Sequence, residues 1–125
     1  MVAFHQEDLS KYNFLITGGA GFIGSNIVEY LISHKANKIR VLDNLSTGFF
    51  KNIEPFVRSN QIEFIEGSIT DAEICMKACE GIDYVSHQAA LGSVPRSLNN
   101  PIASNEANVT GFLNVLWACK EQNVK

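Results

Sequence analysis

The sequence has no run of apolar residues that approaches the roughly 18 needed for a membrane-spanning helix. Its first residues are polar and include Glu7 and Asp8, which argues against a signal peptide. Positive charge is scarce as well, since 10 Lys and Arg stand against 13 Asp and Glu, for a net charge of −3. We therefore expect no membrane and no nucleic acid among its partners, and a cytoplasmic location.

Cysteine and histidine are also few. The chain has three cysteines, Cys75, Cys79 and Cys119. An odd number without regular spacing argues against a disulfide framework, and small buried apolar side chains are a simpler interpretation than a metal pair. The three histidines are scattered and complete no zinc site. With 125 residues, 46% of them hydrophobic, the chain is expected to form one domain with a packed core.

The most informative stretch runs from Asn13 to Gly24. Its apolar start predicts a strand over Asn13–Thr17, and helical spacing of apolar residues predicts a helix over Phe22–His34 that buries Ile23, Ile27, Tyr30 and Leu31. Between them lies a turn with glycines at 18, 19, 21 and 24, in the pattern G-x-G-x-x-G. A helix that starts at such a turn offers unpaired N–H groups and a positive dipole end, which favour a phosphate over a merely structural turn.

A second strand, Lys38–Asp43, ends in a carboxylate nineteen residues after Gly24. An acid at this place suits the hydroxyl pair of a ribose, so the turn and Asp43 together predict a dinucleotide site. The carboxylate would repel a 2′-phosphate, and the first cation after it is Lys51. We therefore expect NAD rather than NADP.

The remaining elements alternate in a β-α manner, which predicts a parallel α/β sheet. Thr70 and Glu73 are expected to form a capping box, and the amino-terminal segment to be a short external helix or a frayed end. The expected elements are a broken helix over Phe49–Ser59, a strand over Gln61–Glu66, a helix over Asp71–Cys79, a strand over Ile82–His87, a loop over Leu91–Asn100 and a helix over Pro101–Gln122.

Two features of the last third bear on function. Long loops at the carboxyl end of a sheet usually carry function, and Arg96 in the loop either pairs with a phosphate or lies solvated on the surface. The final helix is apolar on more than one side, which suggests burial against the sheet and a second contact, such as another subunit. Its apolar residues are Val109, Phe112, Leu113, Leu116 and Trp117, with Val115, Ala118 and Cys119.

Four motifs together closely resemble the nucleotide-sugar epimerases and dehydratases of the extended short-chain dehydrogenase/reductase family. They are Thr17–Gly24, Asp43–Gly48, His87–Ala90 and Asn108–Gly111. The run from His87 to Ser97 resembles more narrowly the bacterial UDP-N-acetylglucosamine 4-epimerases of surface-polysaccharide pathways. The resemblance covers Tyr12 to about Lys120. It implies a partial, truncated Rossmann fold, a doubly wound parallel sheet with strand order 3-2-1-4.

The resemblance also implies roles for residues at matching positions. The pyrophosphate of NAD would lie on Gly18, Gly21, Phe22, Ile23 and Gly24. The adenosine ribose would lie on Asp43 and Asn44 with Ser46, Thr47 and Gly48 nearby, and the adenine beside Ser68 and Ile69. Gln88, Ala89 and Ala90 would line the nicotinamide-side ribose, Ser93 and Val94 would face the sugar, and Asn108 would tie the long helix to the sheet. The family usually has an aspartate where Ser68 stands, so adenine recognition should be weaker or fall to the Ile69 backbone.

The family's Tyr-x-x-x-Lys pair is missing, because the residues four after Tyr12, Tyr30 and Tyr84 are Ile16, His34 and Gln88. We therefore expect residues 1–125 to be the amino-terminal part of an NAD-binding domain, without the rest of that domain or the sugar-binding domain. No catalytic residue is assigned, and the chain alone should be inactive. The parent protein is expected to be an isomerase that converts UDP-N-acetylglucosamine to its galacto epimer by oxidation and re-reduction at C4, with UDP-N-acetylhexosamine as its partner.

Two alternatives stay open. A nucleotide-sugar 4,6-dehydratase or decarboxylase shares this half of the protein, and a noncatalytic NAD-binding module would also lack the Tyr and Lys. We favour a truncated enzyme over the noncatalytic module, because the cut leaves the fourth strand unpaired on one edge, and such an edge invites pairing with another chain. We expect a homodimer, or a fragment that self-associates through that edge or through the helix over Pro101–Gln122.

Overall fold

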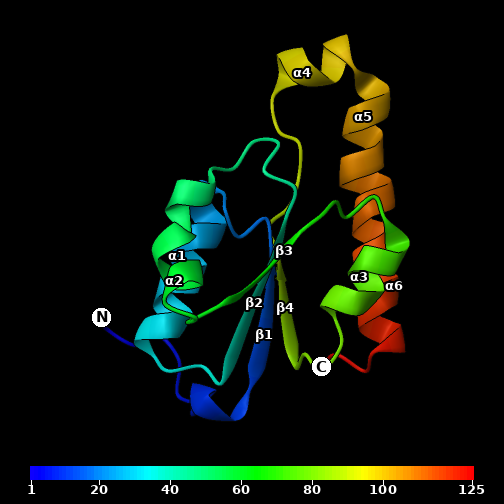
Figure 1. Cartoon of the computed structure of the whole chain (residues 1–125). Helices are drawn as coiled ribbons and strands as arrows, with labels where there is room; N and C mark the ends of the chain where they lie inside the picture. Colours follow the sequence, from blue (N-terminus) through cyan, green and yellow to red (C-terminus); the bar gives the residue numbers. More distant parts are fainter.

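The computed structural model describes all residues 1–125 and shows a four-stranded parallel sheet with helices on both faces (Figure 1). The strands are β1 (Asn13–Thr17), β2 (Lys38–Asp43), β3 (Glu63–Glu66) and β4 (Tyr84–His87), in the order β3-β2-β1-β4. The predicted fold class and strand order are confirmed. Thr17 pairs with Leu42 on one side and His87 on the other, so the carboxyl ends of three strands meet at one edge.

One face of the sheet is covered by α1 (Phe22–Ser33), η2 (Phe50–Asn52) and α2 (Glu54–Arg58). The broken helix predicted around Pro55 is therefore present. The core between these helices and the sheet contains Ile16, Val28, Val41 and Ile53, each fully buried. The predicted face of α1 was wrong at Ile23, which is 62% exposed, because the helix buries Gly24, Val28 and Leu31 instead.

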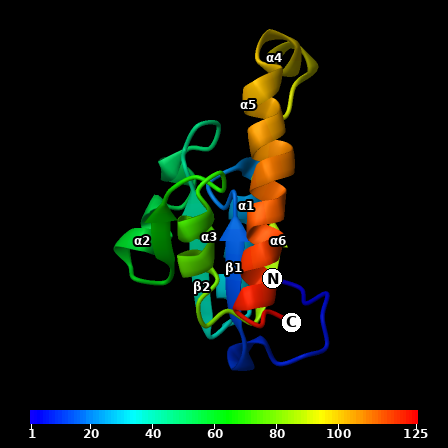
Figure 2. The ribbon, with the colours of Figure 1, turned by 90° about the vertical axis from the view of Figure 1, so that its right-hand side faces the viewer.

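The other face is covered by α3 (Ala72–Ala78) and α6 (Gly111–Glu121), which lie side by side (Figures 1 and 2). Leu15 and Leu42 of the sheet pack there against Val115 and Ala118. Cys75 and Cys79 lie in the same core, where burial raises the pKa of Cys75 to about 11 and that of Cys79 to about 12. These thiols stay protonated at neutral pH and act as small apolar groups, as the sequence suggested.

The long helix predicted over Pro101–Gln122 consists of three continuous parts, α5 (Pro101–Asn105), a π-helical turn η3 (Glu106–Thr110) and α6 (Figure 2). The face toward the sheet carries Val115 and Ala118. The stripe formed by Val109, Phe112, Leu113, Leu116 and Trp117 is at least half exposed. Of the two apolar sets in the sequence, only the smaller one enters the core.

Two further local predictions were wrong. The expected loop over Leu91–Asn100 contains a helix, α4 (Val94–Asn99), because the Ser93 hydroxyl accepts from the Arg96 N–H and Pro95 suits a first turn. The cap of α3 is Asp71 rather than Thr70, since the Asp71 carboxylate accepts from the backbone N–H groups of Glu73 (3.0 Å) and Ile74 (3.3 Å). A carboxylate at this position also complements the helix dipole.

The amino-terminal segment lies outside the sheet and forms one 3-10 turn, η1 (Leu9–Lys11), capped by Asp8. Its backbone reaches α1, where the Phe4 N–H donates to the Tyr30 hydroxyl at 2.7 Å. The external packing considered for this segment is therefore confirmed. No helix in the chain is both long enough and apolar enough to span a bilayer.

A single guanidinium links three elements at the amino-terminal end of the sheet. The Arg40 side chain, 12% exposed, donates from Nε to Glu63 at 2.8 Å, and from Nη1 to the carbonyls of Ala78 (2.7 Å) and Glu80 (2.8 Å). It thus joins β2 to β3 and pairs with carbonyls at the carboxyl end of α3, where the helix dipole favours a cation.

We predict that Arg40→Met lowers the free energy of unfolding by about 2–3 kcal/mol, because the methionine keeps the apolar stem but leaves three acceptors without their donor. The matched control is Lys38→Met. Lys38 lies 3.3 Å from the same Glu63 but is 44% exposed, so its loss should cost at most about 1 kcal/mol. Urea unfolding of the variants measures both values, and equal losses would contradict the role given to Arg40.

Candidate functional site

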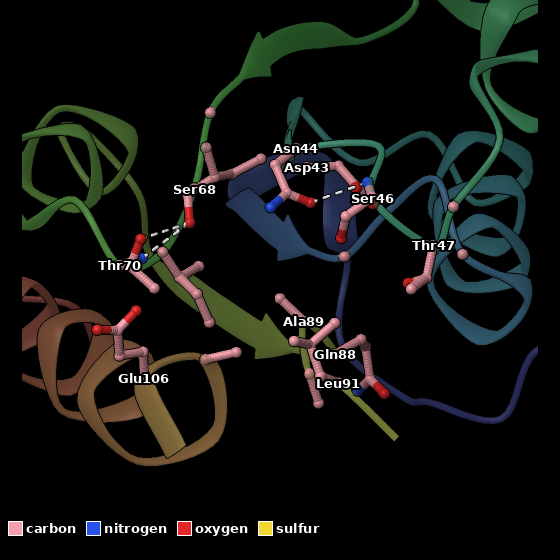
Figure 3. Close-up of a pocket in the computed structure, with 18 of the residues that line it drawn as sticks. Asp43, Asn44, Ser46, Thr47, Ser68, Thr70, Gln88, Ala89, Leu91 and Glu106 are labelled. Carbon is pink, nitrogen blue, oxygen red and sulfur yellow. Dashed lines mark hydrogen bonds between the residues drawn. The ribbon is translucent and has the colours of Figure 1, made fainter. Parts of the chain in front are cut away.

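A cleft of about 290 Å³ opens at the carboxyl edge of the sheet (Figure 3). It lies between the β1–α1 turn, the ends of β2, β3 and β4, and the helix that runs through α5 and η3. Its lining residues are Gly18, Gly21, Leu42, Asp43, Asn44, Ser46, Thr47, Gly48, Gly67, Ser68, Ile69, Thr70, Gln88, Ala89, Ala90, Leu91, Ala103, Glu106 and Ala107. No Lys or Arg is among them.

The β1–α1 turn is built from backbone contacts that leave no room for a side chain. Gly18 has φ +69°, and a Cβ there would lie 2.7 Å from the Ala89 nitrogen. A Cβ on Gly24 would lie 2.2 Å from the Gly18 carbonyl oxygen. Gly21 precedes α1 and provides no side-chain cap, so the first N–H groups of the helix remain available to an anion at the cleft.

Asp43 holds two turns together beneath the cleft. Its carboxylate, on a residue only 8% exposed, accepts from the Ala20 N–H at 2.9 Å and from the Leu45 N–H at 2.8 Å, one on each oxygen. The second contact fixes Leu45 at φ +59°, a conformation unusual for a branched side chain. Each carboxylate oxygen keeps a second lone pair with which it can accept from a ribose hydroxyl.

Thr17 fixes the turn after β4. Its hydroxyl accepts from the N–H groups of Gln88 (3.1 Å) and Ala89 (3.2 Å) and lies 2.7 Å from Nδ1 of His87. Because the oxygen already accepts two hydrogen bonds, its own proton points to His87, whose Nδ1 is then the acceptor and whose ring is neutral. Burial lowers the pKa of His87, which favours the same neutral form.

Most of the residues predicted from the sequence meet in this cleft, and the others lie around it. Twelve of the fifteen predicted cofactor residues line it. Phe22 and Ile23 lie exposed at the start of α1, and Gly24 is buried in the helix. Ser93 and Val94 lie at the start of α4, outside the lining, and Ser93 has a strained φ of +100°. Arg96 donates to the Gly92 carbonyl at 3.0 Å, within its own loop.

Seven lining residues were missed by the sequence analysis: Leu42, Gly67, Thr70, Leu91, Ala103, Glu106 and Ala107. Thr70 was assigned to a helix cap, and the last three belong to a helix with no local motif for a site. The only sequence clue to that wall is Asn108. Its side chain accepts from the Leu91 N–H and donates to the Leu91 carbonyl, both at 2.8 Å, so it ties the helix to the chain after β4 as expected.

Residues 14–125 match the model of the NAD dependent epimerase/dehydratase family. The chain belongs to this family. The expected family, its Rossmann fold and its cofactor, NAD, are thereby confirmed at the level of the family.

Individual relatives show the same relationship. The UDP-glucose 4-epimerase of Lactobacillus helveticus is 39% identical over 113 residues, which are 89% of this chain and 32% of that protein. The UDP-N-acetylglucosamine 4-epimerase from Methanobrevibacter ruminantium M1, solved with UDP-N-acetylmuramic acid, is 40% identical with a TM-score of 0.81 over 91% of this chain and 36% of its own. The dTDP-glucose 4,6-dehydratase DesIV from Streptomyces venezuelae, solved with NAD and TYD, is 33% identical with a TM-score of 0.83 over 90% of this chain and 37% of its own.

This member of the epimerase/dehydratase family thus spans about a third of the length of the relatives it matches. An epimerase and a dehydratase share its fold, at 40% and 33% identity. The relatives of this chain thus include both nucleotide-sugar epimerases and nucleotide-sugar dehydratases.

We predict that the folded chain loses stability as the pH falls below about 6.5, the pKa of an unfolded histidine. The pKa of His87 is lowered in the folded state, so the unfolded chain takes up the proton first and is favoured. The urea midpoint of unfolding should fall between about pH 7.5 and about pH 5. The fall should be smaller in His87→Gln than in the unaltered chain, because the glutamine does not titrate. An identical pH dependence in the two proteins would show that His87 does not contribute.

Proposed function

We propose that this chain holds NAD in the cleft, as the amino-terminal part of the NAD-binding domain of a nucleotide-sugar 4-epimerase. The observation that supports this best is the continuous path from the uncapped start of α1, past the Asp43 carboxylate, to the ends of β3 and β4. A pyrophosphate suits the first part of that path and a ribose the second. Because Gly18 and Gly24 have no side chain, the turn closes tightly enough to bring backbone N–H groups to the ligand.

The choice of NAD over NADP follows from charge. Asp43 and Glu106 are the only charged residues of the lining, and both are acids. A 2′-phosphate on the adenosine ribose would lie close to the Asp43 carboxylate without a cation to compensate it. The cleft therefore favours the cofactor that carries two free ribose hydroxyls.

The chemistry would come from residues that this chain does not contain. None of its three tyrosines is followed four residues later by a lysine, so we assign no catalytic residue here and expect the chain alone to be inactive. In the whole protein a Tyr-x-x-x-Lys pair would remove the proton from the C4 hydroxyl of the sugar. NAD held in the cleft would supply the oxidation and the re-reduction at C4, with the hydride returned to the opposite face of the sugar, and would not be consumed.

The proposed substrate is UDP-N-acetylglucosamine, converted to UDP-N-acetylgalactosamine. Support comes from the run His87–Ser97, which resembles that subgroup, and from the 40% identity to a UDP-N-acetylglucosamine 4-epimerase. We assign Ser93 and Val94 to the sugar end of the site. Their place at the start of α4, with the strained Ser93 backbone, is typical of a binding segment.

Calorimetric titration of the chain tests the cofactor. We expect NAD to bind at least about 10-fold more tightly than NADP, because only NADP places a phosphate against Asp43. Asp43→Asn should bring the two affinities closer together, whereas Asp8→Asn, at the remote amino-terminal turn, should leave their ratio unchanged. Equal affinities in the unaltered chain would contradict the assignment of NAD.

The product formed by the whole protein of this gene tests the reaction. NMR of UDP-N-acetylglucosamine incubated with it should show the galacto epimer. A 4-keto-6-deoxy sugar would instead indicate a dehydratase, and loss of CO₂ from a UDP-uronic acid a decarboxylase. Bound NAD without turnover of any of these substrates would support the noncatalytic module.

We also propose that two copies of the chain associate through the exposed stripe of α6. Phe112, Leu113, Leu116 and Trp117 are each at least 50% exposed along one helix, which is a large apolar surface for a soluble chain of small net charge. Sedimentation equilibrium should show a dimer that Leu116→Glu disrupts and that Val2→Glu, at another exposed apolar residue, leaves intact. A monomer at high concentration would refute this self-association.

A further inference from the structure

The order of the strands gives the cleft a direction. Gly18 and Gly21 lie at the end of β1, and Asp43 and Asn44 at the end of the adjacent β2. The next strand outward is β3, whose chain continues through Gly67–Thr70 along the same cleft. If the pyrophosphate lies at the first place and the adenosine ribose at the second, the base lies at the third. This step rests on the proposed binding of NAD.

The wall at Gly67–Thr70 has few acceptors to offer a base. The hydroxyls of Ser68 and Thr70 lie 2.7 Å apart and bond to each other, and Ser68 Oγ also accepts from the Thr70 N–H at 3.1 Å. The Ile69 carbonyl accepts from Asn114 Nδ2 at 2.9 Å and from Cys75 Sγ at 3.4 Å. These groups therefore have partners within the protein, except for one hydroxyl proton of the Ser68–Thr70 pair.

The opposite wall supplies a carboxylate that has no partner. Glu106 lines the cleft from η3, and Figure 3 shows its side chain directed toward Thr70. The three ion pairs of the chain involve Glu63 and Glu54 and leave Glu106 out. No side-chain hydrogen bond to its carboxylate is formed within the protein. It is thus the one charged acceptor at this end of the cleft.

Packing fixes the backbone at Glu106, whose side chain is exposed at the cleft. A Cβ on Gly111 would lie 2.5 Å from the Ile69 side chain, so the start of α6 lies directly against the segment that follows β3. Gly111 also donates its N–H to the Glu106 carbonyl, the i to i+5 bond of a π turn. The residue that holds the helix against Ile69 is therefore bonded to the residue that carries the carboxylate.

We infer that Glu106 determines the specificity of the cleft for adenine, by accepting a hydrogen bond from the exocyclic amino group of the base. The free hydroxyl proton of Ser68 and Thr70 faces an adjacent ring nitrogen. An acceptor beside a donor matches the amino group and ring nitrogen of adenine. Hypoxanthine presents a carbonyl oxygen in place of the amino group, which would face the Glu106 carboxylate with no proton between them.

The test compares NAD with nicotinamide hypoxanthine dinucleotide, in which a carbonyl oxygen replaces the amino group and the adjacent ring nitrogen carries a proton, so that the donor and the acceptor on this edge of the base are exchanged. Calorimetric titration of the unaltered chain should show NAD binding about 10-fold or more tightly. In Glu106→Gln the ratio should fall close to one, because a carboxamide can turn to donate or to accept. Glu121→Gln, at an exposed glutamate at the far end of the same long helix, in α6, should keep the original ratio.

The outcomes separate this inference from the proposed function. Equal binding of the two dinucleotides by the unaltered chain, or an unchanged ratio in Glu106→Gln, overturns the role of Glu106 while NAD binding stands. Failure of the chain to bind either dinucleotide overturns the proposed function and this inference with it. Because the first comparison uses the unaltered chain, it does not depend on the folding of any variant.

Discussion

The contact between Gly24 and the Gly18 carbonyl is the constraint on which the rest of the structure depends. A Cβ added to Gly24 would lie only 2.2 Å from that oxygen, so no other residue type fits there unless α1 moves. The contact brings the start of α1 onto the turn, and the turn in turn touches the backbone of Gln88 and Ala89 through Gly18. Three segments far apart in the sequence are thus positioned by backbone against backbone, where no side-chain rotation can relieve a change.

The polar groups beneath the cleft are satisfied by the same backbone. Thr17 is fully buried and Asp43 nearly so, and both accept from N–H groups of the neighbouring turns. No buried side-chain nitrogen or oxygen in the chain lacks a partner. The hydrogen bonds of Thr17 and Asp43 are thus complete within the protein and need no ligand. Asn44 and Thr47, which also line the cleft, are exposed. The site therefore combines a rigid base with side chains that remain free to adapt.

The parts of the fold that could be predicted from the sequence are those whose cause is local. The run Asn13–Thr17 and the glycine turn fixed β1 and the start of α1 to the residue, because chain reversal and strand propensity act over a few neighbours. Which face of a helix is buried depends on partners distant in the sequence. Ile23 and the stripe from Val109 to Trp117 have helical spacing but lie exposed, while Gly24 and Ala118, with little hydrophobic surface, are buried. At Gly24 the close approach of two backbone segments decides the position, and a hydrophobic pattern does not record such an approach.

The far wall of the cleft shows the same limit most clearly. In an α-helix of about 3.6 residues per turn, residues five apart point in different directions, whereas the i to i+5 bond of a π turn brings them close to one side. The turn over Glu106–Thr110 thereby allows Gly111 to pack on Ile69 while Glu106 lines the cleft. Asn108, between them, bonds twice to Leu91. The single π turn therefore allows three contacts at once, those of Gly111, Glu106 and Asn108. The sequence carries no pattern for a π turn, so its apolar spacing could predict only a regular helix.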